Sequence, residues 1–311
     1  DAILAEQGIN GEFLDAKLAR DIAARAAEAA KKAVAEARPV THLGLGEGIV
    51  EQVASNRRVL DATGKKVEHV RYSATKDPVV RAKPEGVIDP KLKAISLWDG
   101  ETPLAVMTFY ATHPQSYYRT GLANPDFPGI ARDQRQEATG LFHVHFNGAG
   151  GNITAGKYND GSVENRQILA DRVKAGMDRA WEATKKTPIR ASDLRWGAVP
   201  VALPVDPSLD EAELARIVQD DAAPPRERFR SACELAWVRR CKAGETIDVS
   251  RLALGSARVL FLPGELFVEY QLAAQKLRPD LFVAMAAYGD YGPGYIGTED
   301  AYPQGGYETG R

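Results

Sequence analysis

Rare polar residues follow apolar segments at several points of the chain, where a rigid scaffold usually presents functional groups. His113 comes shortly after the apolar run Leu104 to Ala111 and directly before a proline. An imidazole at the edge of a sheet could bind a metal ion or act as a general base, and it could equally cap the strand end through a loop carbonyl. Glu265 follows the apolar segment VLFLPG, where a carboxylate could belong to a site or simply begin a helix.

Two glycine-rich segments could also contribute to a site. The loop FNGAGGNITAG permits tight turns whose backbone N–H groups could stabilise an oxyanion, with Thr154 as a neighbouring hydroxyl group. It lacks the lysine that follows the last glycine of a phosphate-binding loop, so we exclude a nucleotide site. The segment YGDYGPGYIGTEDAYPQGGYE carries spaced tyrosines and could cover a cleft, or it could serve as packing or interface material.

Histidine and arginine pairs add weaker candidates. His143 and His145 lie on one face of a strand because side chains alternate, so the pair could chelate a metal or simply pack near the sheet edge. Arg57 or Arg58 in the segment SNRR could orient a carboxylate or an amide oxygen through its planar guanidinium, and a surface position is the alternative. The two cysteines, eight residues apart in a helical segment, match neither a disulfide framework nor a zinc-ligand spacing.

The pattern of apolar residues predicts strands that alternate with helices. The Ala-rich segment from Asp15 to about Arg38 predicts a long helix that stops at Pro39. Extended segments are predicted at 42–45, 93–98, 104–111, 141–146, 194–205, 251–262 and 282–287. This order favours an α/β architecture, a mixed sheet with flanking helices. We predict a single catalytic domain over 1–311, with a helical excursion at about 208–242.

The composition is that of a folded protein without a nucleic-acid partner. Hydrophobic residues make up 44% and charged residues 26% of the 311, which excludes a disordered chain. Lys and Arg total 40 against 42 for Asp and Glu, so the net charge of −2 provides no basic surface for a phosphate backbone. We find no signal segment, and no apolar run approaches the ~20 residues of a membrane-spanning helix.

Taken together and in their order, the motifs resemble the catalytic domain of the neutral, non-lysosomal ceramidases and their bacterial relatives. The agreement runs from NRR through YATHP, DFPG, NGAGGNIT and LPGEL to the tyrosine-rich tail, so it covers most of the chain. The resemblance implies a zinc ion held by two histidines, a glutamate and a tyrosine. Three of these ligands correspond to His113, Glu265 and Tyr295. The resemblance also implies that Tyr307 contacts the substrate and that Arg57 positions its polar head.

The chain departs from the ceramidase pattern at two places. The family's other zinc histidine stands in a His-Thr-His segment that would come shortly before residue 1, so either the start of the protein is missing here or the site is incomplete. Because DAILAEQG resembles the continuation of that segment and the chain stops just after the tail motif, we expect missing ends. We also find no C-terminal immunoglobulin-like domain. Where ceramidases read GDVSPN, with a serine implicated in catalysis, this chain reads GNITAG, which puts Thr154 at the serine position. Threonine keeps the hydroxyl group but adds a methyl group that restricts its rotamer.

The resemblance therefore implies a Zn²⁺-dependent hydrolase of an N-acyl amide, with ceramide-like lipids or related amides or esters as substrates and possible access to them at a membrane surface. Zinc with an open coordination position lowers the pKa of bound water to about 7, which gives a nucleophile at neutral pH. By analogy with exported relatives we expect a secreted or periplasmic location. Two alternatives stay open: a hydrolase with a different metal use or a small polar substrate, and a protein that binds without catalysis.

Overall fold

A computed structural model describes residues 3, 5, 15–121, 123–289 and 293–310. Its chain divides into two compact units. The larger unit comprises residues 40–199 and 249–311, and the smaller unit comprises residues 1–39 and 200–248. Within the described residues, no helix combines the length and the apolar character that crossing a bilayer requires.

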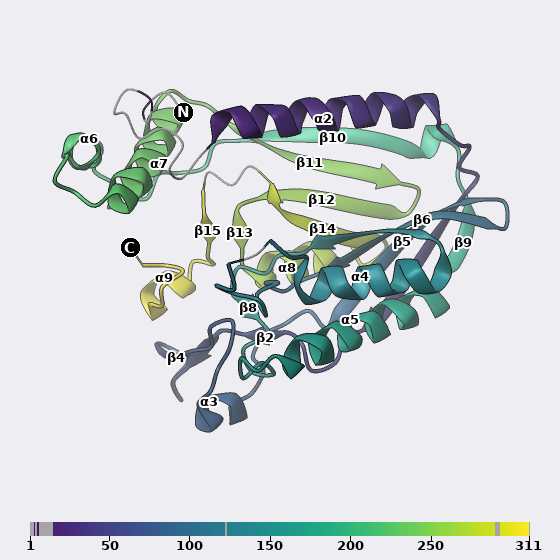
Figure 1. The fold of residues 1–311 in the computed structure, drawn as a ribbon, viewed down its shortest axis with the longest axis horizontal. Helices are drawn as coiled ribbons and strands as arrows, with labels where there is room; N and C mark the ends of the chain where they lie inside the picture. The colour runs from purple at the N-terminus through teal and green to yellow at the C-terminus, as the bar shows by residue number, and fades with distance from the viewer. Residues whose placement is uncertain (1–2, 4, 6–14, 122, 290–292, 311) are drawn as a thin grey trace. The chain divides into compact units, whose positions relative to one another are not determined.

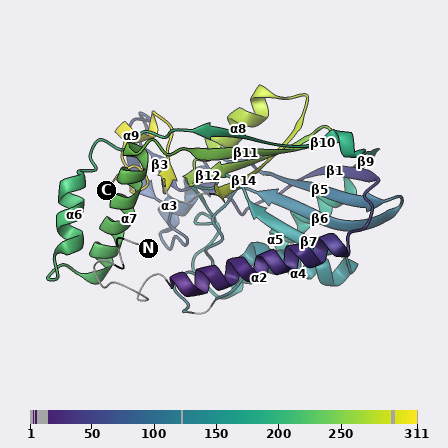
Figure 2. The same ribbon diagram turned by 90° about the horizontal axis from the view of Figure 1, so that it is seen from above.

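The first sheet of the larger unit has five strands in the order β7-β6-β5-β1-β9. Figure 1 labels β5, β6 and β9, and Figure 2 labels all five. The strands are β1 (His42–Ile49), β5 (Lys91–Asp99), β6 (Thr102–Tyr110), β7 (Phe142–Asn147) and β9 (Lys185–Pro188). The pair β6–β7 is parallel, and the pairs β5–β6, β1–β5 and β1–β9 are antiparallel. The helices α4 (Asp126–Thr139) and α5 (Glu164–Glu182) pack their buried residues against this sheet, in one core with Leu92, Ala94 and Val106.

A second sheet contains β10 (Leu194–Val201), β11 (Ile247–Leu254), β12 (Ala257–Pro263) and β14 (Phe282–Gly289), in that order. Figure 2 shows the two sheets as separate layers. Leu43, Ile95 and Phe109 of the first sheet share a core with Val259 and Ala284 of the second. Because β12 pairs with β14 in parallel and β11 with β12 antiparallel, this sheet is mixed, as the first one is. The predicted α/β class with a mixed sheet and flanking helices is confirmed.

Three two-stranded pairs lie outside the large sheets. They are β2 (Ser55–Asn56) with β8 (Ile153–Thr154), β13 (Glu265–Leu266) with β15 (Tyr295–Ile296), and β3 (Arg58–Leu60) with β4 (Val67–Val70). The larger unit also contains the short helices α3 (Pro78–Ala82) and α9 (Ala301–Gln304), the longer helix α8 (Val268–Leu277) and the 3-10 helix η1 (Ala191–Asp193). These short pairs join segments that are distant in sequence, and most of the predicted site residues lie on them or beside them.

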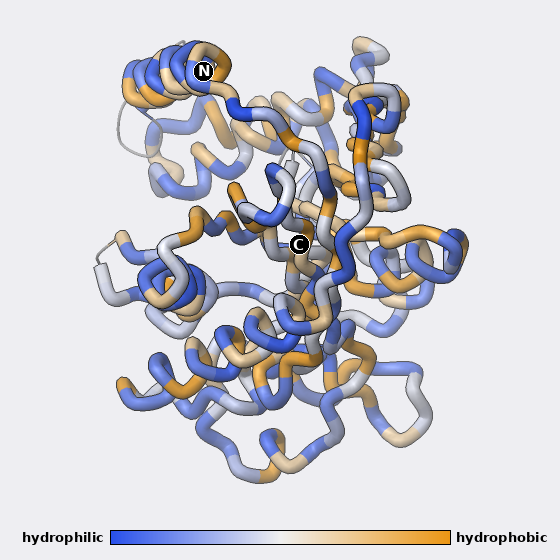
Figure 3. Tube along the Cα trace, turned by 90° about the vertical axis from the view of Figure 1, so that its right-hand side faces the viewer, coloured by the Kyte–Doolittle hydropathy of each residue, from blue (hydrophilic) through white to orange (hydrophobic). Residues whose placement is uncertain are grey.

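In its described residues the smaller unit contains the helices α2 (Ala16–Ala35), α6 (Glu211–Gln219) and α7 (Pro225–Lys242). The side chain of Asp15 accepts a hydrogen bond from the backbone N–H of Leu18, so it caps α2, the helix that the Ala-rich segment predicts. The excursion predicted at 208–242 holds α6 and α7, which bury leucines and valines against each other. Hydrophilic and hydrophobic residues alternate along the helices (Figure 3); α6 and α7 bury part of their apolar residues, whereas the described side chains of α2 are exposed.

Candidate active site

His113 lies just beyond β6, where its side chain is buried and both ring nitrogens face polar groups. Its Nε2 lies 2.7 Å from Oε2 of Glu265. Its Nδ1 lies 2.8 Å from Nη2 of Arg57 and 3.0 Å from the carbonyl oxygen of Ile153. The backbone N–H of His113 also donates to that carbonyl, at 3.1 Å. The histidine is therefore fixed from both sides.

Each neutral tautomer of His113 uses a different part of these contacts. With the proton on Nε2, the ring donates to Glu265 and its Nδ1 accepts from Arg57. With the proton on Nδ1, the ring donates to the Ile153 carbonyl, the Arg57 N–H loses Nδ1 as its acceptor, and the lone pair on Nε2 becomes available to a metal ion. A backbone carbonyl in that position is a common outer partner of metal-binding histidines. The surroundings thus fit a histidine that can bind a metal through Nε2.

Glu265 and Tyr295 stand opposite each other in the parallel pair β13–β15. The backbone N–H of Glu265 donates to the carbonyl of Gly294 at 2.7 Å, and the Glu265 side chain is buried. The preceding Gly264 has φ of +61°, and a Cβ there would lie 2.5 Å from the Gly294 carbonyl oxygen, so the PGE turn requires glycine. Glu265 lies on β13 and α8 begins only at Val268, so the structure does not support the role of a helix-start residue.

Tyr295 completes a set of three oxygen and nitrogen donors. Its ring centroid lies 6.5 Å from that of His113. Burial raises the pKa of the Tyr295 phenol to about 12, the Arg57 charge opposes this, and the Glu265 charge adds to it. The phenol is therefore protonated at neutral pH and would be a weak, exchangeable ligand until a cation lowers its pKa.

Arg57 and Tyr307 border the three donors. The guanidinium of Arg57 is buried and lies 5.9 Å from the ring centroid of Tyr295 and 5.3 Å from that of Tyr307. The two tyrosine hydroxyls are 3.5 Å apart. Tyr307 is partly exposed and stacks on Tyr72, which is 58% exposed, with ring centroids 5.7 Å apart. A buried cation and an accessible aromatic pair thus stand beside the three donors.

Thr154 takes a different position. Its hydroxyl is buried, donates to the carbonyl of Arg71 at 3.3 Å and accepts from the N–H of Gly156 at 3.1 Å. These bonds tie the hydroxyl to the turn of the glycine-rich loop. The neighbouring Ile153, through its carbonyl, is the residue of this loop that contacts His113. The catalytic role of Thr154 stays a prediction.

The donor set fits zinc. Zinc accepts imidazole nitrogen and carboxylate oxygen, and a catalytic site with three protein ligands keeps a position open. Within the described ranges, no group of three or more His, Cys, Asp or Glu is placed to hold a metal, so the set depends on the Tyr295 phenol as third donor. The other histidines lie elsewhere: His42 beside Thr41, His69 beside Glu68, and two on β7.

Comparison with known proteins bears on this arrangement. No family model and no curated protein matches the sequence. The solved neutral ceramidase from Pseudomonas aeruginosa superposes with a TM-score of 0.57 and 17% sequence identity, over 87% of this chain and 48% of its own. A ceramidase described as complexed with C2 gives a TM-score of 0.56 and 17% identity, over 87% and 50%.

The chain has the fold of a neutral ceramidase. At 17% identity the likeness establishes the fold, and the chain spans about half the length of the ceramidases that it matches. The predicted resemblance is confirmed at that level. The assignment of His113, Glu265 and Tyr295 as metal ligands, and of Arg57, Thr154 and Tyr307 as catalytic residues, stays a prediction.

In this ceramidase-like fold, the histidine pair on β7 is packed and bonded. Nδ1 of His143 lies 2.6 Å from the Leu141 carbonyl, and Nδ1 of His145 lies 2.9 Å from the Thr108 hydroxyl. Burial lowers the pKa of both rings, that of His145 to about 4, and nearby arginines on α4 add to the effect. Of the two alternatives for this pair, the packed role is the one that these contacts favour.

Sequence reasoning missed three polar residues that support the candidate site. Asp126 has φ of +52° and accepts hydrogen bonds from the backbone of Ser116 and Tyr117, which follow the histidine loop. Asn152 accepts from the N–H of Val268 and so joins the glycine-rich loop to α8. Glu308 contacts two buried arginines. Asp126 stands within the DFPG motif, which the sequence analysis uses only for the family resemblance, and its strained backbone has no signal in the sequence.

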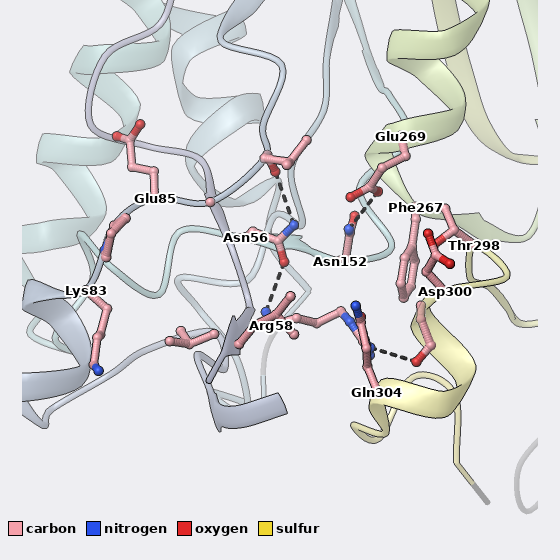
Figure 4. Close-up of a pocket in the computed structure, with 16 residues that line it drawn as sticks. Asn56, Arg58, Lys83, Glu85, Asn152, Phe267, Glu269, Thr298, Asp300 and Gln304 are labelled. Atoms are coloured by element: carbon pink, nitrogen blue, oxygen red, sulfur yellow. Dashed lines mark hydrogen bonds between the residues drawn. The ribbon is translucent and has the colours of Figure 1, made fainter. Parts of the chain in front are cut away.

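A cavity of about 460 Å³ lies close to the site in the larger unit (Figure 4). Asn56, Arg58, Asn152, Phe267 and Glu269 are among the residues that line it. Its lining includes none of the six residues predicted for the site, although several are their neighbours in sequence. The cavity is therefore adjacent to the candidate catalytic groups and separate from them.

Proposed function

We propose that this protein is a zinc-dependent hydrolase of N-acyl amides, with ceramide-like lipids as the substrate class. The observation that carries the proposal is the convergence of His113, Glu265 and Tyr295 beside the buried guanidinium of Arg57. These residues come from four separate segments of a chain with the fold of neutral ceramidase. Fold alone does not fix function, so the proposal rests on this set of side chains.

Each residue has a distinct part in the proposed reaction. His113, Glu265 and Tyr295 would hold the metal ion. When bound, zinc supplies a water-derived nucleophile at neutral pH and polarises a carbonyl group. The buried guanidinium of Arg57 lies beside these three residues, and its planar N–H groups suit an amide or carboxylate oxygen. Tyr307 borders this space and would contact the substrate beside its polar head.

The surface beside Arg57 supports a lipid amide over a small polar one. Tyr72 and Tyr307 are stacked and 58% and 39% exposed. Exposed aromatic rings beside a buried cation match an amphipathic molecule, whose polar amide meets the arginine and whose chain meets the rings. The same proposal includes a secreted or periplasmic location with access to substrate at a membrane surface, by analogy with exported relatives.

Hydrolysis of a panel of acyl amides tests this proposal. The panel contains N-acylsphingosine, an N-acyl amino acid and a short polar amide, with wild type assayed before chelation, after chelation and after zinc is restored. We expect hydrolysis of the long-chain amides that chelation abolishes and zinc restores. Glu265→Gln removes a proposed ligand and should lower kcat/KM by roughly 100-fold or more.

The matched control is Glu299→Gln, because Glu299 is an exposed glutamate of the C-terminal segment. It should hydrolyse the panel as wild type does. Wild type that cleaves none of the amides, or that cleaves them equally well after chelation, would contradict the proposal. Preference for the short polar amide would support zinc-dependent amide hydrolysis but contradict a lipid as the substrate.

A further inference from the structure

Glu308 places a buried carboxylate between two buried arginines. Its side chain is fully buried, and its Oε2 accepts from Nη1 of Arg58 at 3.2 Å. Its Oε1 lies 3.8 Å from Nε of Arg57. Buried charges are stable only when they are paired, because the protein interior replaces water poorly. Glu308 thus supplies a countercharge to both guanidinium groups at once.

The backbone around Glu308 is built for this contact. Nη2 of Arg58 donates to the carbonyl of Ala301 at 2.8 Å and to the side-chain oxygen of Gln304 at 3.3 Å. Gly306 has φ of +98°, and a Cβ there would lie 2.6 Å from Nη1 of Arg58. Only glycine allows so close an approach in that conformation. The segment 301–308 therefore turns around the Arg58 guanidinium. This turn places the Glu308 carboxylate close to the neighbouring Arg57.

Arg57 is the residue that this carboxylate can orient. Among the described residues, Arg57 Nε and Glu308 Oε1 make no hydrogen bond, and each is the other's charged neighbour at 3.8 Å. At its other end, Arg57 Nη2 contacts His113 Nδ1 at 2.8 Å. The guanidinium is therefore placed between Glu308 and His113, with the rings of Tyr295 and Tyr307 beside it. Without Glu308, the two buried guanidinium groups would lose their shared countercharge, and Arg57 would no longer be held at His113.

We propose that Glu308 is a positioning residue that acts through Arg57: it holds the guanidinium at His113 and beside the two tyrosines, where Arg57 meets the substrate oxygen. The inference rests on the proposed hydrolase function. The Glu308 side chain is fully buried against the two arginines, so on this inference it acts on catalysis through Arg57. If its role were purely structural, Glu308 would instead anchor the segment 301–308 by its contact with Arg58.

A kinetic double-mutant cycle separates these roles. The variants are Arg57→Lys, which keeps the charge and loses the fork, Glu308→Gln, and the two combined, with Glu299→Gln as control. We expect Glu308→Gln to lower kcat by about 10- to 100-fold while KM changes less than about 3-fold. Because the carboxylate acts through Arg57, adding Glu308→Gln to Arg57→Lys should lower kcat by less than about 3-fold.

Full additivity of the two substitutions would overturn the inference, since Glu308 would then act by a route other than Arg57. Unchanged kcat in Glu308→Gln would overturn it as well. Crystal structures of the same variants give an answer that needs no activity, so failure of the hydrolase proposal is distinguished from failure of this one. We expect the Arg57–His113 contact to be kept in Glu299→Gln and lost in Glu308→Gln. Its retention in Glu308→Gln would contradict the positioning role.

Discussion

His145 is a titratable residue on β7, partly buried as a whole and with a buried Nε2, and it is not one of the proposed ligands. Its Nδ1 lies 2.9 Å from the Thr108 hydroxyl, and its Nε2 has no hydrogen-bond partner in the part of the chain that the structure describes. Burial, with a smaller contribution from the charge of Arg132, lowers its pKa to about 4. In the unfolded chain the ring returns to its ordinary pKa of 6.5. The unfolded state therefore binds more protons between these values.

We expect His145 to make stability depend on pH in this window. The free energy of unfolding is not reduced by His145 above about pH 6.5. As the pH falls toward about 4, protonation of the unfolded chain lowers it by up to about 3 kcal/mol. His145→Gln cannot titrate, so its unfolding free energy should fall less steeply with acidification than that of wild type. Urea unfolding at a series of pH values measures both curves. Unfolding free energies of wild type and His145→Gln that fall in parallel with pH would contradict this account. His143 is present in both proteins, so it contributes equally to both curves.

At the scale of single residues, motif order predicted part of the candidate site. His113, Glu265, Tyr295, Arg57 and Tyr307 do lie together, although each was ambiguous when taken alone. Glu308 was missed because a glutamate in a glycine-rich tail has the pattern of an exposed loop residue. Only its contact with two arginines 250 residues earlier in the chain reveals its burial.

At the scale of elements, β1 packs against α5 on one face and against the core between the two sheets on the other. Its glycines alternate with larger residues, so Gly44, Gly46 and Gly48 share one face while Leu43 and Leu45 share the other. The leucines pack in the core between the two sheets. A Cβ added at Gly46 would overlap the backbone carbonyl of Ala180 on α5. The glycine face thus lets α5 lie directly against the strand.

Gly46→Ala should therefore destabilise the protein by at least about 2 kcal/mol, because backbone on both sides must move to accommodate one methyl group. The control is Gly197→Ala on β10, where the nearest atom belongs to the flexible side chain of Arg251, at 3.3 Å. That variant should differ from wild type by no more than about 0.5 kcal/mol. Urea unfolding compares the two. Equal midpoints would show that α5 does not need the glycine face.

Element type was easier to predict from the sequence than element pairing. The apolar run 104–111 and the Ala-rich segment gave β6 and α2 because their patterns are local. The segment 251–262, predicted as one extended stretch, is two antiparallel strands, β11 and β12, with a turn at Gly255. The pair β13–β15, which brings Glu265 to Tyr295, is set by contacts across 30 residues and leaves no periodic signal.

At the scale of the whole molecule, all the predicted site residues belong to the larger unit. The smaller unit includes α6 and α7, which the chain inserts between the neighbouring strands β10 and β11. The single catalytic domain predicted over 1–311 stays a prediction. Composition predicted a folded protein, and the order of its apolar segments predicted the α/β class. They could not predict the division into units, which depends on where long-range contacts are sparse.

Zinc content per chain tests the central claim most directly. Elemental analysis is performed after equilibration with zinc and removal of the excess, for wild type, Glu265→Gln and the exposed control Glu299→Gln. We predict about one zinc per chain in wild type and in the control, and a sharp loss in Glu265→Gln. Wild type without zinc, or Glu265→Gln with as much zinc as wild type, would contradict the ligand set and leave the ceramidase likeness as evidence of fold only.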